Sequence, residues 1–188
     1  MVKKRWLAVI GLSIVIVIVY AHDRTYYRDT VPFLAPINFD GDVPIRCDEL
    51  GDGEFGASRK GRRTHKGLDI LAEVGTPARA AKSGWVAVGN VPDGMGKYVR
   101  IRHRGGLVTI YGHLSKINVR RWQKVRQGDI VGETGKTGNA DHPAIVPHLH
   151  FEVRNHGSSV DPLGYLESSK VRQHDEEAVV DSVAYELE

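Results

Sequence analysis

Short apolar runs separated by turn residues fill most of the chain, from residue 51 to residue 167. Several of these runs alternate apolar and polar positions with the period of two that is typical of β-strands. Gly105-Gly106 between two runs favours a hairpin turn, and residues 117–125 are the best candidate for a short helix or a turn. We therefore predict a mostly β domain over residues 51–167, built on a single antiparallel sheet. The predicted strands lie within residues 84–88, 98–103, 107–111, 125–132 and 148–154.

A different pattern opens the chain. Residues 6–21 form an uncharged, largely apolar run that follows three basic residues at positions 3–5. As a helix this run would span about 24 Å, slightly less than the roughly 30 Å hydrocarbon core of a bilayer. It predicts an N-terminal hydrophobic helix over residues 1–21, either an uncleaved membrane anchor or a signal peptide cut before His22. We favour the anchor because the run is long and β-branched, and the basic flank predicts that the rest of the chain lies outside the cytoplasm.

Two further segments flank the predicted domain. Residues 22–50 mix charged residues, prolines and isolated aromatics without a period, and three prolines in this segment disfavour a helix. We interpret residues 22–50 as a tether, with a short strand near residues 31–34. Residues 168–188 hold six acidic residues against two basic ones and show no strand pattern. We interpret them as a mobile acidic tail, in which residues 176–181 form at most a weak helix.

The composition excludes several classes of protein. With 188 residues, of which 41% are hydrophobic and 26% charged, the chain is neither disordered throughout nor a polytopic membrane protein. Its single cysteine, Cys47, excludes an intramolecular disulfide framework and a multi-cysteine zinc cluster. The net charge is +3, and because the tail contributes −4, the rest of the chain carries +7. The basic clusters at residues 3–5, 59–63 and 120–126 are either solvated surface or attract an anionic polymer. A cell-wall polymer would serve as well as nucleic acid, for which no motif is present.

Nine histidines are many for this length, and some of them have metal-ligand spacing. His148 and His150 lie two positions apart in His-Leu-His, so on a strand both side chains point to the same face. His65 and Asp69 would share a face in the same way if this stretch is extended, with Gly67 leaving room between them. Two or three imidazoles and a carboxylate suit Zn2+ in a tetrahedral site.

A catalytic zinc site has three protein ligands and one open position, where the pKa of bound water falls towards ~7. His65, Asp69 and one histidine of the 148/150 pair would complete the ligand set. The other histidine of the pair, and His113, would then move protons or stabilise an oxyanion. The sequence has neither a His-Glu-x-x-His motif nor a Gly-x-Ser-x-Gly turn, which argues against a helical zinc protease and a serine nucleophile. We assign surface or loop roles to the remaining histidines, which are His22, His103, His142, His156 and His174.

Further short stretches extend these motifs along the chain in a fixed order: residues 65–70, 75–81, 83–86, 96–103, 109–115, 128–132, 135–138, 147–152 and 160–166. In order and spacing they resemble the lysostaphin-type, or LytM-like, zinc endopeptidases of metallopeptidase family twenty-three. The resemblance implies that His65, Asp69 and His150 bind zinc, and that His113 and His148 are the catalytic histidines. It also implies an antiparallel β core with loops that form an open zinc-containing groove, and the peptide part of peptidoglycan as substrate.

The resemblance departs at residues 139–146, where the link before the His-Leu-His motif is longer and would border the groove. We predict a zinc-dependent endopeptidase of the cell envelope that cuts peptidoglycan cross-links between D-amino acids rather than glycine-rich bridges. It would be membrane-anchored, or secreted if residues 1–21 are cleaved. Two other hypotheses stand beside it, a non-catalytic wall-binding activator of another hydrolase and a hydrolase of a non-wall protein. The full set of five metal and catalytic residues argues against the activator, because such relatives lack metal ligands.

Overall fold

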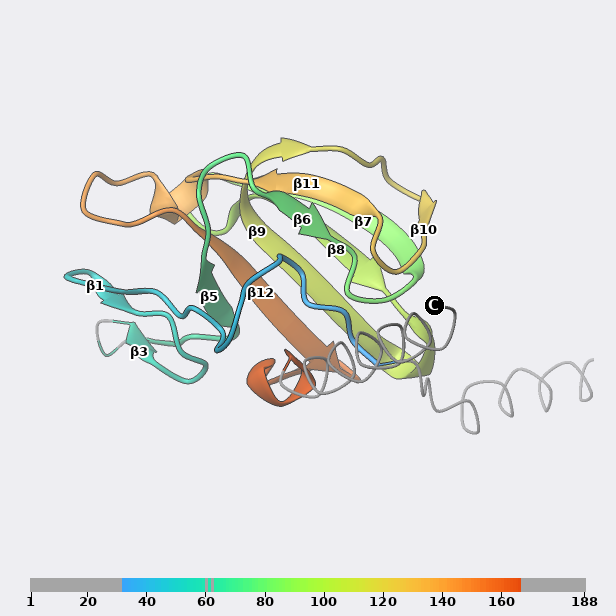
Figure 1. Ribbon diagram of the computed structural model, residues 1–188, viewed down its shortest axis with the longest axis horizontal. Helices are drawn as coiled ribbons and strands as arrows, with labels where there is room; N and C mark the ends of the chain where they lie inside the picture. Colours follow the sequence, from blue (N-terminus) through green and yellow to red (C-terminus); the bar gives the residue numbers. More distant parts are fainter. Residues whose placement is uncertain (1–31, 60, 62, 167–188) are drawn as a thin grey trace, which may run out of the picture.

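A computed structural model describes residues 32–59, 61 and 63–166, and in this part of the chain the fold is mostly β, as the sequence predicts (Figure 1). Two short 3-10 helices, η1 (Arg104–Gly106) and η2 (Gly138–Ala140), interrupt the strands. The strands are β1 (Cys47–Asp48), β2 (Gly51–Asp52), β3 (Ser58–Arg59), β4 (Arg63–Thr64), β5 (Leu68–Leu71), β6 (Pro77–Arg79), β7 (Gly84–Val91), β8 (Gly96–Arg102), β9 (Leu107–Ile117), β10 (Lys124–Val125), β11 (Ile130–Thr134), β12 (His148–Asn155) and β13 (Ser158–Val160).

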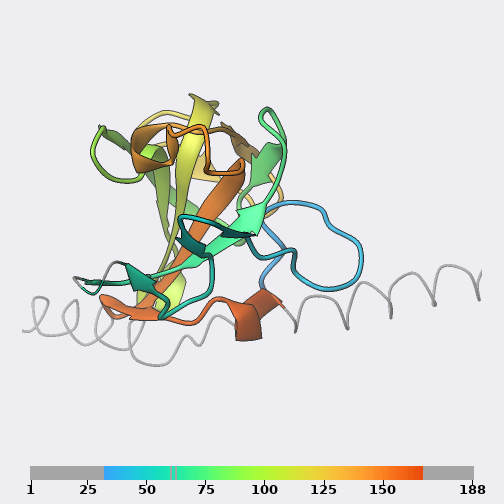
Figure 2. The same ribbon diagram turned by 90° about the vertical axis from the view of Figure 1, so that its left-hand side faces the viewer.

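Nine of these strands form one antiparallel sheet. The long strand β9 pairs with β8 on one edge, and with β12 and then β11 on the other. β12 in turn pairs with β5, so that it lies between β9 and β5 (Figure 1). The small ladders β1–β2 and β3–β4 lie beside β5, on the side of the molecule that faces the viewer in Figure 2.

The core follows from the alternation of side chains along the strands. On β12, Leu149, Phe151 and Val153 are fully buried in the hydrophobic core, and the rings of Tyr111 and Phe151 lie 5.4 Å apart between centroids. The alternate positions of β12 point to the other face of the sheet, and there His148 is the first side chain. The same strand therefore builds the core and presents polar groups.

Each strand predicted within residues 51–167 overlaps an observed strand, but β9 continues to residue 117 instead of ending at residue 111. The strands β5, β6 and β13 were not predicted. Gly105 and Gly106, at φ 66° and 76°, turn the chain between β8 and β9, as the predicted hairpin requires. Residues 118–123 contain a bend and a turn instead of a helix, and the turn is closed by a hydrogen bond from Gln123 N–H to the Arg120 carbonyl oxygen. The stretch between β9 and β10 holds fewer than two helical turns, and a helix this short is costly to nucleate.

The segment interpreted as a tether packs against the sheet from residue 32 onward. Phe33, Ile37 and Val43 are buried in the core, although residues 32–34 form no strand. An antiparallel bridge between Ile45 and Ile70 then places the following residues beside β5. The apolar side chains are spaced irregularly around prolines, so each is a separate contact and no periodic signal precedes it. The domain boundary at residue 50 stays a prediction.

Two predictions lie outside the described residues. These are the N-terminal hydrophobic helix, whether anchor or signal peptide, and the acidic tail over residues 168–188 with its weak helix. Within the described part of the chain, the helices are too short or too polar to cross a bilayer.

Candidate metal centre

Three strands and one loop bring the five predicted site residues together at one end of β12. Asp69 lies on β5, His148 and His150 on β12, and His113 on β9, while His65 lies in the loop before β5. The register of the β5–β12 pair sets His150 opposite Asp69. All five residues are buried, with exposed fractions between 1% and 8%. The open groove around the site stays a prediction.

One atom from each of three residues converges on a single point. His150 Nδ1 lies 2.8 Å from Asp69 Oδ1 and 3.0 Å from His65 Nε2, and His65 Nε2 lies 3.0 Å from Asp69 Oδ1. The three ligand atoms lie within 4.8 Å of one another. Two imidazole nitrogens and one carboxylate oxygen in this arrangement suit Zn2+, which accepts three protein ligands in a catalytic site.

The outward nitrogens of both histidines are bonded to protein oxygens. His65 Nδ1–H donates to the Glu54 carbonyl oxygen at 2.8 Å, and His150 Nε2–H donates to Glu152 Oε1 at 3.1 Å. Arg154 holds the other oxygen of Glu152 with two hydrogen bonds. Metal-binding histidines usually have such a partner, which fixes the ring and directs the remaining nitrogen to the metal. The hydrogen bonds around both rings are therefore as suitable for a metal site as the donor atoms are.

The opposite charges of Asp69 and His150 stabilise each other within the triad, which consists of His65, Asp69 and His150. Burial opposes the charge of Asp69, but hydrogen bonds from His150 and His65 outweigh burial and hold the pKa of Asp69 well below its usual range. Burial also opposes the charge of His150, but hydrogen bonds to Asp69 and Glu152 raise its pKa to about 9. The metal-free site thus holds a proton on His150 beside an ionised carboxylate, at the position where a metal cation would replace that proton.

The second oxygen of Asp69 is held by two arginines. Arg46 Nη1 donates to Asp69 Oδ2 at 2.9 Å, and Arg59 Nη2 donates to the same oxygen at 2.8 Å. Arg46 is itself buried, with 4% of its surface exposed. Sequence reasoning missed both contacts. Arg59 lies in a basic stretch without ligand spacing, and nothing in the pattern around Arg46 marks it.

His113 and His148 lie beside the triad with their rings 4.9 Å apart. Each donates Nδ1–H to a carbonyl oxygen, His113 to Thr137 at 2.8 Å and His148 to Val146 at 2.7 Å. In both rings Nε2 is therefore the free nitrogen. His148 Nε2 is buried without a hydrogen-bond partner and lies 3.8 Å from Asp69 Oδ2.

Burial favours the neutral form of both of these histidines. Burial, together with the nearby charges of His150 and His148, lowers the pKa of His113 to about 3. Burial also lowers the pKa of His148. His113 has a left-handed backbone, with φ 57°, which is uncommon for a residue other than glycine and often occurs at functional sites. A neutral ring with a free Nε2 offers a hydrogen-bond acceptor towards the triad of His65, Asp69 and His150.

The structure distinguishes His148 from His150 and locates the other histidines of the described residues. His150 shares the triad with His65 and Asp69, whereas His148 stands outside it. His103 follows β8 and is buried, with its ring bonded to the Ser83 carbonyl and to Thr109, so it supports the core. Of the remaining histidines, His142 and His156 are exposed, and His22 and His174 lie outside the described residues.

Two glycines are required for close approach at this site. A Cβ at Gly67 would meet the Phe151 carbonyl oxygen of the neighbouring strand β12. A Cβ at Gly53 would lie 2.9 Å from both the Arg46 carbonyl oxygen and Asp69 Cβ. Gly67 thus lets β5 reach β12, which is a different role from the open space that the sequence suggested.

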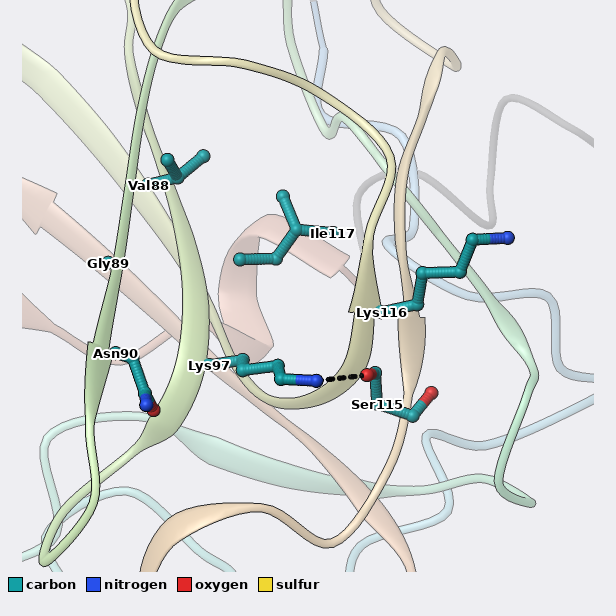
Figure 3. A pocket seen from close by; sticks show the side chains of 7 residues that line it. All are labelled: Val88, Gly89, Asn90, Lys97, Ser115, Lys116 and Ile117. Carbon is teal, nitrogen blue, oxygen red and sulfur yellow. Dashed lines mark hydrogen bonds between the residues drawn. The ribbon is translucent and has the colours of Figure 1, made fainter.

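A separate hollow of about 530 Å3 lies between β7, β8 and the end of β9 (Figure 3). Val88 and Ile117 supply apolar walls, and Lys97 donates from Nζ to the Ser115 carbonyl oxygen at 2.9 Å. None of the five site residues lines this hollow. It is therefore distinct from the candidate metal centre.

Residues 63–162 match the sequence model described as peptidase family M23. The chain belongs to peptidase family M23. The match confirms the resemblance found in the sequence. One relative is the peptidoglycan DD-endopeptidase ShyC of Vibrio cholerae, 37% identical over 100 residues, which are 53% of this chain and 22% of ShyC. The chain spans about a quarter of the length of the first curated relatives it matches, 26% in the first of them.

Solved structures of M23 peptidases have the same fold. A zinc-containing peptidase from Vibrio cholerae is 29% identical, with a TM-score of 0.58, and the match covers 71% of this chain and 40% of that one. The catalytic domain of the antimicrobial peptidase lysostaphin from Staphylococcus simulans is 30% identical, with a TM-score of 0.54. That match covers 61% of this chain and 89% of the lysostaphin domain. The predicted antiparallel β core is therefore that of the family.

Proposed function

We propose that this chain is a zinc-dependent endopeptidase that hydrolyses peptide cross-links of peptidoglycan. The observation that carries the proposal is the convergence of His65 Nε2, Asp69 Oδ1 and His150 Nδ1 within 4.8 Å. The relative named as a peptidoglycan DD-endopeptidase supports the substrate class and the choice of cross-links between D-amino acids. A peptidoglycan substrate locates the activity in the cell envelope, with residues 1–21 as the membrane anchor.

The chemistry follows from the free nitrogen atoms of the site. His65, Asp69 and His150 would hold Zn2+, which in such sites lowers the pKa of water and polarises a carbonyl. His148 Nε2, buried and without a partner, accepts the proton of the attacking water, because its Nδ1–H is held by a carbonyl. The same nitrogen then donates this proton to the leaving amine as the C–N bond breaks. His113 Nε2 is a second acceptor that orients the water.

The proposal is tested with the full chain and purified peptidoglycan, by mass spectrometry of the released fragments. We expect new amino and carboxyl termini at cross-links, which disappear with a chelator and return with added zinc. Asp69→Ala should lose both bound metal and cleavage, whereas His113→Ala should keep the metal and lose cleavage. His156→Ala, at an exposed turn, is the matched control and should keep both.

Three results would contradict the proposal. Wall binding by metal-replete protein without new termini would indicate an activator of another hydrolase. Cleavage that a chelator does not affect would exclude a metal-dependent reaction. New termini within glycine bridges instead of D-amino-acid cross-links would correct the substrate.

A further inference from the structure

Asp69 has two carboxylate oxygens, and their contacts differ. Oδ1 faces His65 Nε2 and His150 Nδ1, at 3.0 and 2.8 Å. Oδ2 accepts one N–H from Arg46 and one from Arg59, at 2.9 and 2.8 Å. An ionised carboxylate oxygen has about two lone-pair sites, so both sites of Oδ2 are occupied by charged donors. Only Oδ1 is left to bind a metal.

Arg46 cannot swing away from this position without breaking several contacts. Its Nε and Nη2 donate to the two oxygens of Asp48, at 2.7 and 3.0 Å, and Nη2 also donates to the Gly51 carbonyl oxygen at 3.2 Å. Its backbone N–H donates to the Asp69 carbonyl oxygen at 2.9 Å. Charged hydrogen bonds in a fixed fork of this kind are stronger than neutral ones. The guanidinium is therefore a rigid support for the carboxylate.

The same support reaches the catalytic histidine. Asp48 Oδ2 accepts the backbone N–H of Val146 at 3.3 Å, and the Val146 carbonyl accepts Nδ1–H of His148 at 2.7 Å. Val146, in the long link before β12, thus connects His148 to Asp48 and, through Arg46, to Asp69. The orientation of the metal ligand and the orientation of the proton acceptor depend on one network.

We propose that Arg46 and Arg59 are positioning residues that restrict Asp69 to a single metal-binding oxygen and so keep the fourth metal position open. This inference rests on the metal site of the proposed function. Carboxylates bind metals through one or two oxygens, and a second oxygen from Asp69 would fill the position that a catalytic zinc needs for water and substrate. The two guanidinium groups oppose this, because they already occupy Oδ2 with two charged hydrogen bonds.

The experiment replaces zinc by Co2+ in the full chain and records the visible spectrum, because four-coordinate cobalt absorbs more strongly than five-coordinate cobalt. Arg59→Gln, Arg46→Gln and the double variant are compared with Arg79→Gln, a partly buried arginine that bonds the Gly128 carbonyl far from the triad. We expect the first three to lose absorption intensity while cobalt affinity does not fall, and cleavage to fall about 10–100-fold. Arg59→Lys, which returns one charged donor, should recover the intensity.

Each outcome of the cobalt experiment either supports or contradicts the proposed role of Arg46 and Arg59. If the arginine variants keep the wild-type spectrum, the proposal is wrong. If their cobalt affinity falls in parallel with thermal stability, the arginines only stabilise the fold, and the proposal is again wrong. Arg59 has 19% of its side chain exposed, against 5% for Arg46, so Arg59→Gln provides a result even where Arg46→Gln does not fold. A wild-type chain that binds no cobalt would overturn the proposed function itself.

Discussion

Replacing His113 by asparagine tests the electrostatic description of the site. His113 has φ 57°, and asparagine tolerates this left-handed conformation better than most residues. The asparagine amide can also donate to the Thr137 carbonyl oxygen, which accepts Nδ1–H of His113 at 2.8 Å. His113→Asn therefore removes a titratable ring from a buried position with little backbone strain.

The expected change in the pH dependence of stability follows from the shift in the pKa of His113, from 6.5 to about 3. Between these values the unfolded chain binds more protons than the folded chain, so stability is present above pH 6.5 and is lost as the pH falls. One pKa unit corresponds to about 1.36 kcal/mol, so His113 should cost about 2 kcal/mol more stability at pH 5 than at pH 7. The variant should lose about 2 kcal/mol less than the wild type between these pH values.

Urea unfolding of the metal-free full chain at pH 7 and pH 5, at constant ionic strength, measures this difference. Circular dichroism is the better probe, because Trp85 and Trp122 are already 54% and 66% exposed in the folded state. His156→Asn is the matched control, since His156 also has a left-handed backbone, with φ 49°, but lies at an exposed turn. Equal pH dependence in His113→Asn and the wild type would refute the reasoning, as would an equal change in the control.

Three further changes test the packing and the support of the metal centre. Phe151→Ala, in the fully buried core, should lower the free energy of unfolding by about 3–5 kcal/mol in urea titrations. Gly67→Ala should push β5 from β12 and lower both thermal stability and zinc content, and unchanged zinc content would contradict its role in close approach. Glu152→Gln removes the charged acceptor of His150 and should weaken zinc binding about 10–100-fold in a competition assay with a chelator. Equal zinc affinity would contradict this orienting role.

Much of the sheet could be predicted from the alternation of side chains along single strands. On β12 this alternation indicates both the core residues and the site residues. The period of two along β12 places Leu149 and Phe151 in the core and His148 and His150 on the other face. Glu152 continues the same alternation, so its place beside His150 was also accessible from the sequence. Local alternation needs no knowledge of the partner strand, and this explains why it succeeds.

The remainder of the site depends on contacts between distant segments. Alternation gives His148 and His150 the same face, and only the pairing of β12 with β5 sets His150 opposite Asp69. Arg46 is 23 positions from Asp69, in a segment with no period, and a single buried arginine leaves no repeating signal. The support of His65 is a backbone carbonyl, that of Glu54, which any residue type could supply.

The family match begins at residue 63, whereas Arg46, Glu54 and Arg59 all lie before it. A fragment excised at that boundary would carry the three proposed metal ligands and both proposed catalytic histidines. It would lack the carbonyl that orients His65 and the two guanidinium groups that hold Asp69. Activity measured on such a fragment would describe a loosened site. Chimeras between members of the family should therefore be joined ahead of residue 32. The core contacts of Phe33 and Ile37 are then retained in the same segment as the site.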